Sequence, residues 1–146
     1  MKFKMIIDKT KDEEITATVH APSQLTEAVA RLVQEYTGTD RITVWKEDEM
    51  KVLLFAEISC ITVMEGKTVV IDREGNQYRH KQRLYELEEL LPPGFIRINK
   101  STIANEKQIE HFAATFSGAV DAVFRCGWRE YVSRRCYAQI KRRYDL

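Results

Sequence analysis

The sequence has no apolar run that approaches the roughly 20 residues needed to span a bilayer. Its first residues, MKFKMIIDKTKDEE, become polar and acidic too early to contain the apolar core of a signal peptide. It has only three cysteines, Cys60, Cys126 and Cys136, and no two of them are close in sequence. This odd, scattered set argues against a disulfide framework and predicts a reducing, cytoplasmic location.

The common signatures of catalysis and of metal or cofactor binding are also missing. The three histidines, His20, His80 and His111, are isolated, and the sequence contains no HxxxH, CxxC or HExxH pattern. Neither GxGxxG nor GxxxxGK[ST] occurs, and no serine or cysteine is marked as an activated nucleophile. We therefore expect no enzyme, no metal, no cofactor and no small-molecule substrate.

Positive charge is concentrated at the C-terminal end. Residues 125–146 contain seven Lys or Arg against two acidic residues, although the whole chain has a net charge of only +1. The first 124 residues therefore carry a net charge of −4. A basic end on an acidic body indicates a polyanionic partner.

Residues 1–40 are predicted to form a small αβ extension. Residues 2–7 and 13–20 have the pattern of two short strands separated by a polar turn. A helix follows, with Ser23 as its N-cap and Gly38 at its end, and it carries one apolar stripe: Leu25, Val29, Leu32, Val33 and Tyr36. The stripe either packs on the two strands or forms a surface for a partner subunit.

Residues 41–146 are predicted to form a mostly β domain with short helices, so the fold class is α+β. We expect a hairpin turning at 47–49 and two strands within 60–80 that turn at 73–76. A short helix then ends at Pro92-Pro93-Gly94, and four strands follow at 95–99, 109–116, 119–125 and 129–133. Alternation in the first of these places Phe95, Arg97 and Asn99 on one side, opposite Ile96 and Ile98.

The last element, 134–144, is predicted to be a helix capped by Ser133, with Tyr137, Ile140 and Tyr144 facing the body. Arg134 and Arg135 fall in its first turn, where the helix dipole disfavours cations but a bound phosphate would favour them. The residues alone leave two interpretations equally open, a phosphate-binding element and a docked helix with a soluble outer face. A membrane-surface helix is disfavoured by the narrow, tyrosine-rich apolar face.

Residues 42–146 resemble the LytTR family of bacterial DNA-binding domains. The resemblance rests on GFIRINKSTIANEKQI at 94–109, followed by a glycine turn and YVSRR at 131–135. The upstream stretches EISCITVMEGKTVVIDREGNQY and LYELEELLPPGF fit the family in order and spacing. The sequence departs from the family pattern at Asn99, usually His, and at Ala104, usually Val. Forty residues also cannot hold the receiver domain often fused to such domains.

The resemblance implies antiparallel sheets whose loops enter successive major grooves of a direct-repeat promoter site. The implied base contacts are Lys67, Lys100 and Arg135. The implied supports or phosphate contacts are Arg97, Asn99, Ser101, Ser133 and Arg134.

The expected partner is therefore double-stranded DNA, and the expected function is transcription regulation. The extension would either pair two copies as a homodimer or be held by a membrane-bound inhibitory partner. The alternative is a protein-interaction module whose basic end docks on an acidic protein.

Overall fold

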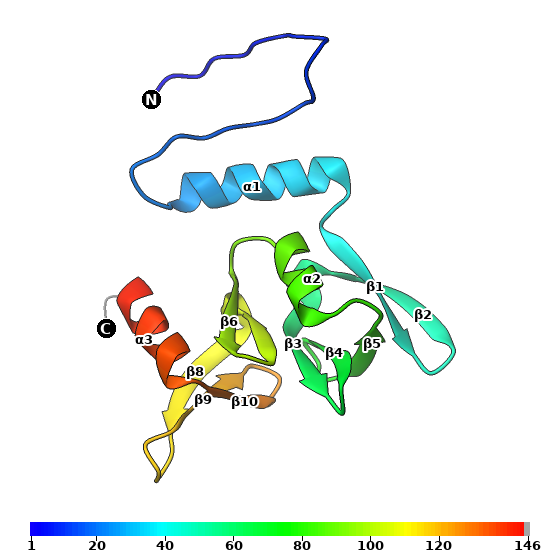
Figure 1. The fold of residues 1–146 in the computed structure, drawn as a ribbon, viewed down its shortest axis with the longest axis vertical. Coiled ribbons are helices and arrows are strands. Elements are labelled where there is room, and N and C mark those ends of the chain that lie inside the picture. The colour runs from blue at the N-terminus through cyan, green and yellow to red at the C-terminus, as the bar shows by residue number, and fades with distance from the viewer. Residues whose placement is uncertain (145–146) are drawn as a thin grey trace.

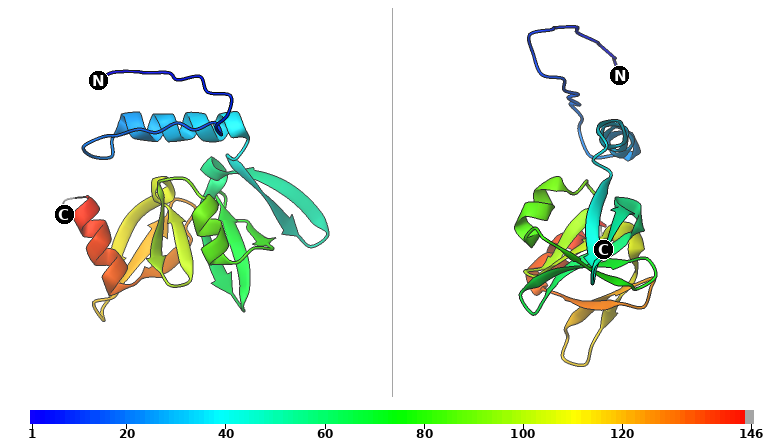
Figure 2. Two further views of the ribbon diagram at one scale, coloured as in Figure 1. Left: turned by 45° about the horizontal axis from the view of Figure 1, so that its top comes forward. Right: turned by 90° about the vertical axis from the view of Figure 1, so that its right-hand side faces the viewer.

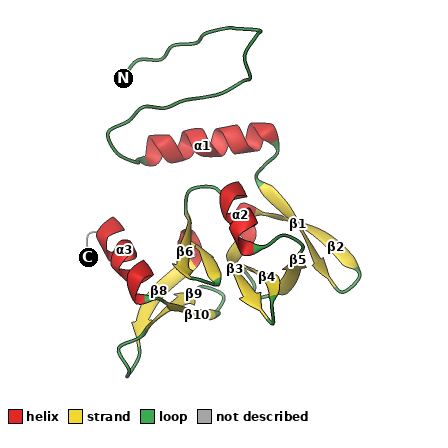
Figure 3. Ribbon diagram, viewed as in Figure 1, coloured by secondary structure: helices red, strands yellow, loops and turns green. Residues whose placement is uncertain are grey.

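The computed structural model describes residues 1–144, and within that range the chain forms two antiparallel sheets and three α-helices (Figures 1 and 3). The larger sheet has the strand order β2-β1-β5-β4-β3-β7-β6 and the smaller one β10-β9-β8. The predicted mostly β fold class is confirmed. The strands of the larger sheet are β1 Arg41–Lys46, β2 Glu49–Leu54, β3 Ile58–Met64, β4 Lys67–Asp72, β5 Gln77–His80, β6 Phe95–Asn99 and β7 Thr102–Asn105. The remaining elements are β8 Ile109–Ala114, β9 Val120–Phe124, β10 Arg129–Val132, α1 Gln24–Thr37, α2 Leu84–Leu90 and α3 Arg134–Arg143.

The core consists of two clusters on opposite faces of the central strands. Alternate side chains point to opposite faces of a strand, so Ile61 of β3 packs in the cluster beneath α2, and its neighbour Cys60 packs in the cluster between the two sheets. The second cluster also contains Phe124 of β9 and Ile140 of α3. Burial on both faces explains why β3 and β4 carry nearly continuous apolar runs.

Residues 58–80 form three strands rather than the two that the sequence predicted. The additional turn is the two-residue connection Glu65-Gly66, where both residues adopt left-handed backbone angles, φ 53° and 73°. Such a turn joins antiparallel strands tightly, and glycine reaches this conformation without steric cost. The predicted turn at 73–76 is present between β4 and β5.

The strand alternation predicted for 95–99 fails after Arg97. A bulge shifts the register of β6 against β7 between Arg97 and Asn99, so Ile98 and Asn99 are both buried. The next strand, β7, was not predicted. It is buried along its whole length, but its polar residues Thr102 and Asn105 have the composition of a loop.

The strands predicted at 2–7 and 13–20 are absent. Residues 1–22 contain no strand, and all of them are exposed, although Lys11 N donates to Asp8 O across 3.3 Å in the predicted turn. A lone two-stranded hairpin is marginally stable in water, and these segments pair with neither each other nor a sheet edge. In Figures 1 and 2 the segment lies on the side of α1 that faces away from the sheets.

Helix α1 is confirmed, but its expected packing on those strands is wrong. Ser23 caps the helix, with its backbone N–H donating to Thr26 Oγ1 across 2.8 Å, and Gly38 ends it in the left-handed conformation, φ 73°. None of its side chains is buried.

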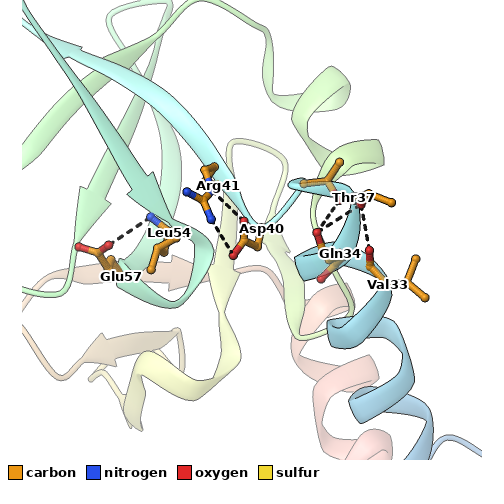
Figure 4. A network of polar contacts seen from close by, with 8 residues as sticks. Val33, Gln34, Thr37, Asp40, Arg41, Leu54 and Glu57 are labelled. Carbon is orange, nitrogen blue, oxygen red and sulfur yellow. Dashed lines mark hydrogen bonds and ion pairs between the residues drawn. The ribbon is translucent and has the colours of Figure 1, made fainter.

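The joint between α1 and β1 is held on both of its sides (Figure 4). On the helix side, Thr37 Oγ1 donates to Val33 O across 2.9 Å. On the sheet side, Arg41 Nε donates to Asp40 Oδ1 across 2.8 Å, and Phe55 N donates to Asp40 O across 2.9 Å. Gly38 and Thr39 lie between these residues and are themselves bonded back to the helix, since Gly38 N donates to Glu35 O across 3.3 Å and Thr39 N to Gln34 O across 2.9 Å.

The core assignment predicts that Phe124→Ala lowers the free energy of unfolding by about 3–5 kcal/mol, because it removes a fully buried ring and leaves a cavity. Phe116→Ala is the matched control, since this ring in the β8–β9 turn is fully exposed and its loss should cost less than about 0.5 kcal/mol. Urea unfolding followed by circular dichroism measures both. Equal losses in the two variants would contradict the assignment.

Candidate nucleic-acid interface

Three segments that are distant in sequence meet at one end of the fold. They are the β3–β4 turn, the β6–β7 turn and the connection from β10 to α3. Val63 N donates to Ser101 O across 3.0 Å, which joins the first two, and Ser133 N donates to Ile98 O across 2.8 Å, which brings in the third. These segments carry all eight residues that the sequence predicted for the site.

Asn99 holds the β6–β7 turn against β10. Its side chain is only 2% exposed; Nδ2 donates to Tyr131 O across 2.7 Å, and Oδ1 accepts from Ser101 N across 2.8 Å. Both polar atoms are therefore committed within the protein. A buried amide that satisfies both partners fixes the backbone on either side of Lys100.

Arg97 also acts within the protein. Its Nη1 donates to Lys100 O across 2.6 Å, and its Nη2 pairs with Glu88 Oε2 of α2 across 2.9 Å. The guanidinium thus spans the β6–β7 turn and the end of α2. Arg97 and Asn99 set the position of Lys100, whose ammonium points into solvent.

Four predicted site cations, Lys67, Lys100, Arg134 and Arg135, are exposed and form no ion pair with any residue in 1–144. Other arginines do have carboxylate partners, such as Arg129 with Asp121 and Arg143 with Glu106. Because no carboxylate neutralises them, these cations attract an external anion more strongly than paired cations do.

The N-terminus of α3 adds to this field. Ser133 caps the helix by accepting from Cys136 N across 3.2 Å, so the predicted cap is confirmed. Arg134 and Arg135 follow in the first turn, where cations cost about 0.3–1 kcal/mol each against the helix dipole. A bound phosphate would reverse that penalty. Of the residues predicted to face the body, Ile140 is buried and Tyr137 half-buried, whereas Tyr144 is largely exposed.

Beneath these segments a polar chain links the two sheets. Thr62 Oγ1 and Thr102 Oγ1 are 2.9 Å apart, and Thr102 Oγ1 donates to Glu130 Oε2 across 3.4 Å. Glu130 Oε1 accepts in turn from Trp128 Nε1 across 2.9 Å. The smaller sheet is thus fixed relative to the β3–β7 strand pair, which helps to set the spacing between Lys100 and Arg135.

A groove of about 800 Å³ extends from Lys67 and Lys100 toward β5. Sequence reasoning missed its far wall, which is lined by Arg79, Lys81 and Arg83. These residues occur at every second position along and just after β5, and this strand-period alternation of basic residues was the available signal. Lys81 Nζ lies 4.6 Å from the centre of the Trp45 ring. Burial lowers the pKa of His80, so the charge of the groove at neutral pH comes from its Lys and Arg residues.

The fold and this surface define a class: a mostly β domain whose turns and one helix N-terminus present unpaired cations on a single face. A family model of the LytTr DNA-binding domain matches residues 48–145, so the chain belongs to the LytTR family of DNA-binding domains.

Known proteins resemble the chain over different extents. An uncharacterized HTH-type transcriptional regulator of Staphylococcus aureus strain MSSA476 is 27% identical, and the alignment covers 100% of this chain and 99% of that protein. The corresponding protein of strain NCTC 8325 is 26% identical over the same shares. The solved LytTr DNA-binding domain of a Bacillus cereus response regulator has the same fold, with a TM-score of 0.66, 24% identity, and coverage of 73% of this chain and 98% of that one. The family match makes residues 48–145 a DNA-binding domain of the LytTR type.

The helices of residues 1–144 do not form a helix-turn-helix. In chain order α2 and α3 are separated by the five strands β6 to β10, and α1 and α2 by β1 to β5. Of the four exposed site cations, Lys67 and Lys100 lie at or next to turns between strands, and Arg134 and Arg135 lie in the first turn of α3. None of these helices is both long and apolar enough to cross a membrane.

The support role of Asn99 predicts that Asn99→Ala weakens DNA binding without touching DNA, because the turn that carries Lys100 loses its anchor to β10. It should also cost about 1–3 kcal/mol of stability, since Tyr131 O loses a buried donor. Binding is measured by fluorescence anisotropy on a promoter fragment.

Asn105→Ala is the matched control, because this equally buried amide donates to Ile58 O across 2.8 Å away from the cation-bearing turns. It should cost similar stability and leave binding nearly unchanged. Equal losses of binding in the two variants would contradict the positioning role.

Proposed function

We propose that the chain is a sequence-specific regulator that reads duplex DNA with the turns of its sheets. The observation that carries the proposal is the meeting of three hydrogen-bonded segments near which Lys67, Lys100, Arg134 and Arg135 are exposed, with no ion pair to any residue in 1–144. The proposed unit of binding is residues 41–146, of which 145 and 146 lie outside the described residues, and residues 1–40 are an extension to it.

The roles follow from reach and burial. Arg135 donates in bidentate fashion to a guanine edge, and a good pair of this kind is worth about 1–3 kcal/mol of discrimination against other bases. Lys67 and Lys100 contact bases in the adjoining part of the major groove. Ser101, Ser133 and Arg134 contact phosphates, while Arg97 and Asn99 hold Lys100 in place.

The groove cations extend the contact with the DNA backbone. Arg79, Lys81 and Arg83 form a row continuous with Lys67, and a row of this kind neutralises successive phosphates without reading sequence. Binding through both groups of cations should depend steeply on salt.

A direct-repeat promoter site, with one chain on each repeat, fits such a surface, and its place of action is the cytoplasm. An acidic protein docked on the basic face is the alternative. The membrane-bound inhibitory partner stays a prediction from family resemblance.

Base reading by Arg135 predicts that Arg135→Ala loses roughly 5- to 160-fold of the discrimination between a promoter fragment and its scrambled counterpart, which corresponds to about 1–3 kcal/mol. Lys81→Ala should instead weaken both fragments alike and reduce the slope of log K against log salt by about one. Gel shifts over a salt series measure both quantities.

Lys107→Ala is the control, because this exposed cation lies outside both the meeting segments and the basic groove. It should leave affinity and discrimination unchanged. If the wild-type chain does not distinguish the two fragments at any salt concentration, the proposal fails and the protein-docking alternative stands.

A further inference from the structure

Helix α1 turns part of its apolar stripe away from the sheets: Leu25, Leu32 and Tyr36 are exposed, whereas Val29 and Val33 are half-buried. Its opposite face lines a cleft of about 520 Å³ against the body, with Glu27, Arg31 and Gln34 among the lining residues. At 100° per residue, Leu25, Leu32 and Tyr36 lie on the side directly across from these three. Leu32 is 64% and Tyr36 84% exposed, so the amphipathic helix is inverted relative to the core.

The segment before α1 is apolar and exposed as well. Residues 2–7 carry the exposed apolar side chains Phe3, Met5, Ile6 and Ile7, and residues 13–20 carry the exposed side chains Ile15 and Val19. Together with the helix stripe they make up the N-terminal apolar surface: Phe3, Met5, Ile6, Ile7, Ile15, Val19, Leu25, Leu32 and Tyr36. Figure 2 shows helix α1, and the segment before it, on the outer side of the molecule.

This surface lacks the packing that its elements need. A 14-residue helix is close to the shortest that is even marginally stable alone, and helices in proteins take most of their stability from burying an apolar face. No side chain of α1 is buried. Soluble monomers rarely expose contiguous apolar patches above several hundred Å², and larger ones mark interaction sites.

We propose that a second copy of this chain covers the N-terminal apolar surface, so that residues 1–37 of two chains pair. At roughly 60–120 Å² of burial for each large apolar side chain, the nine side chains offer on the order of 500–1,100 Å² per chain. A stable interface needs about 800 Å² from each partner. The available surface is thus of the right size for one copy.

Charge and pattern both favour self-pairing. Residues 1–22 carry four lysines and four acidic residues, so the segment is neutral overall and favours neither an acidic partner nor an anionic membrane. Two short strands in one chain are too few for a stable sheet. Two chains together supply four such segments, and three or more strands are needed for independent stability.

The N-terminal apolar surface lies outside the part of the chain that the LytTr family model matches, residues 48–145. The solved LytTr domain is matched over 98% of its own length by 73% of this chain, so that fold forms without an extension of this kind. The full-length alignment with the Staphylococcus aureus regulator nevertheless includes residues 1–40. Pairing is therefore a separate function of the extension, independent of DNA contact.

The test is the molar mass of the full chain in the absence of DNA, measured by light scattering after size exclusion over the micromolar range. The wild type should be a dimer. Leu32→Lys and Ile7→Lys, one from each part of the surface, should each shift the mass to that of a monomer, because a lysine opposite an apolar partner must lose its hydration.

Met50→Lys is the matched control, since Met50 is 67% exposed on β2 and outside the surface. It should remain a dimer. Unchanged DNA affinity per chain on a single-repeat fragment confirms that the lysine variants are folded.

A wild type that is monomeric at all concentrations overturns the proposal, and so does a dimer that survives both lysine variants. A monomer that cosediments with phosphatidylglycerol vesicles, and loses this with Leu32→Lys, would assign the surface to a membrane instead.

Discussion

The end of the molecule that carries Lys67, Lys100 and Arg135 depends on one buried amide. Asn99 donates to Tyr131 O and accepts from Ser101 N, so a single side chain ties β10 to the β6–β7 turn, and the bond from Ser133 N to Ile98 O adds the start of α3. The bulge after Arg97 makes this contact available, because it turns Asn99 inward where regular alternation would place it beside Arg97. Without the bulge, Lys100 would have no fixed relation to Arg135.

The basic residues fall into two groups, those paired with carboxylates and those without such a partner in residues 1–144. Arg97 and Arg143 are bound to carboxylates and hold elements together, at the modest value that partly exposed pairs have. Lys67, Lys100 and Arg135 have no carboxylate partner in residues 1–144. Arg135 also lies in the first turn of α3, where the positive end of the helix dipole repels its charge. These unpaired cations repel one another in the free protein, and they attract a bound polyanion.

The sequence predicted the elements whose signals are local and failed where tertiary contacts decide. Ser133 and Gly38 mark helix ends through their own chemistry, and both predictions are confirmed. Strand β7 was missed because Thr102 and Asn105 are polar residues satisfied by partners far away in the chain. The groove wall at Arg79, Lys81 and Arg83 was overlooked for a related reason, since only the sheet order places β5 beside the site. The strands predicted at 2–7 and 13–20 lack a partner in a single chain, which no local pattern reveals.

The short joint at Gly38 and Thr39 carries a consequence for symmetry. Two extensions that pair through one self-complementary surface are related by a two-fold axis, whereas two repeats that run in the same direction along DNA are related by a translation. A single pair of chains can satisfy both relations only if its two DNA-binding domains take different angles to their α1 helices. Because Thr39 N donates to Gln34 O of the helix and Phe55 N donates to Asp40 O, such a change of angle requires rotation between Thr39 and Asp40 or the loss of one of these hydrogen bonds.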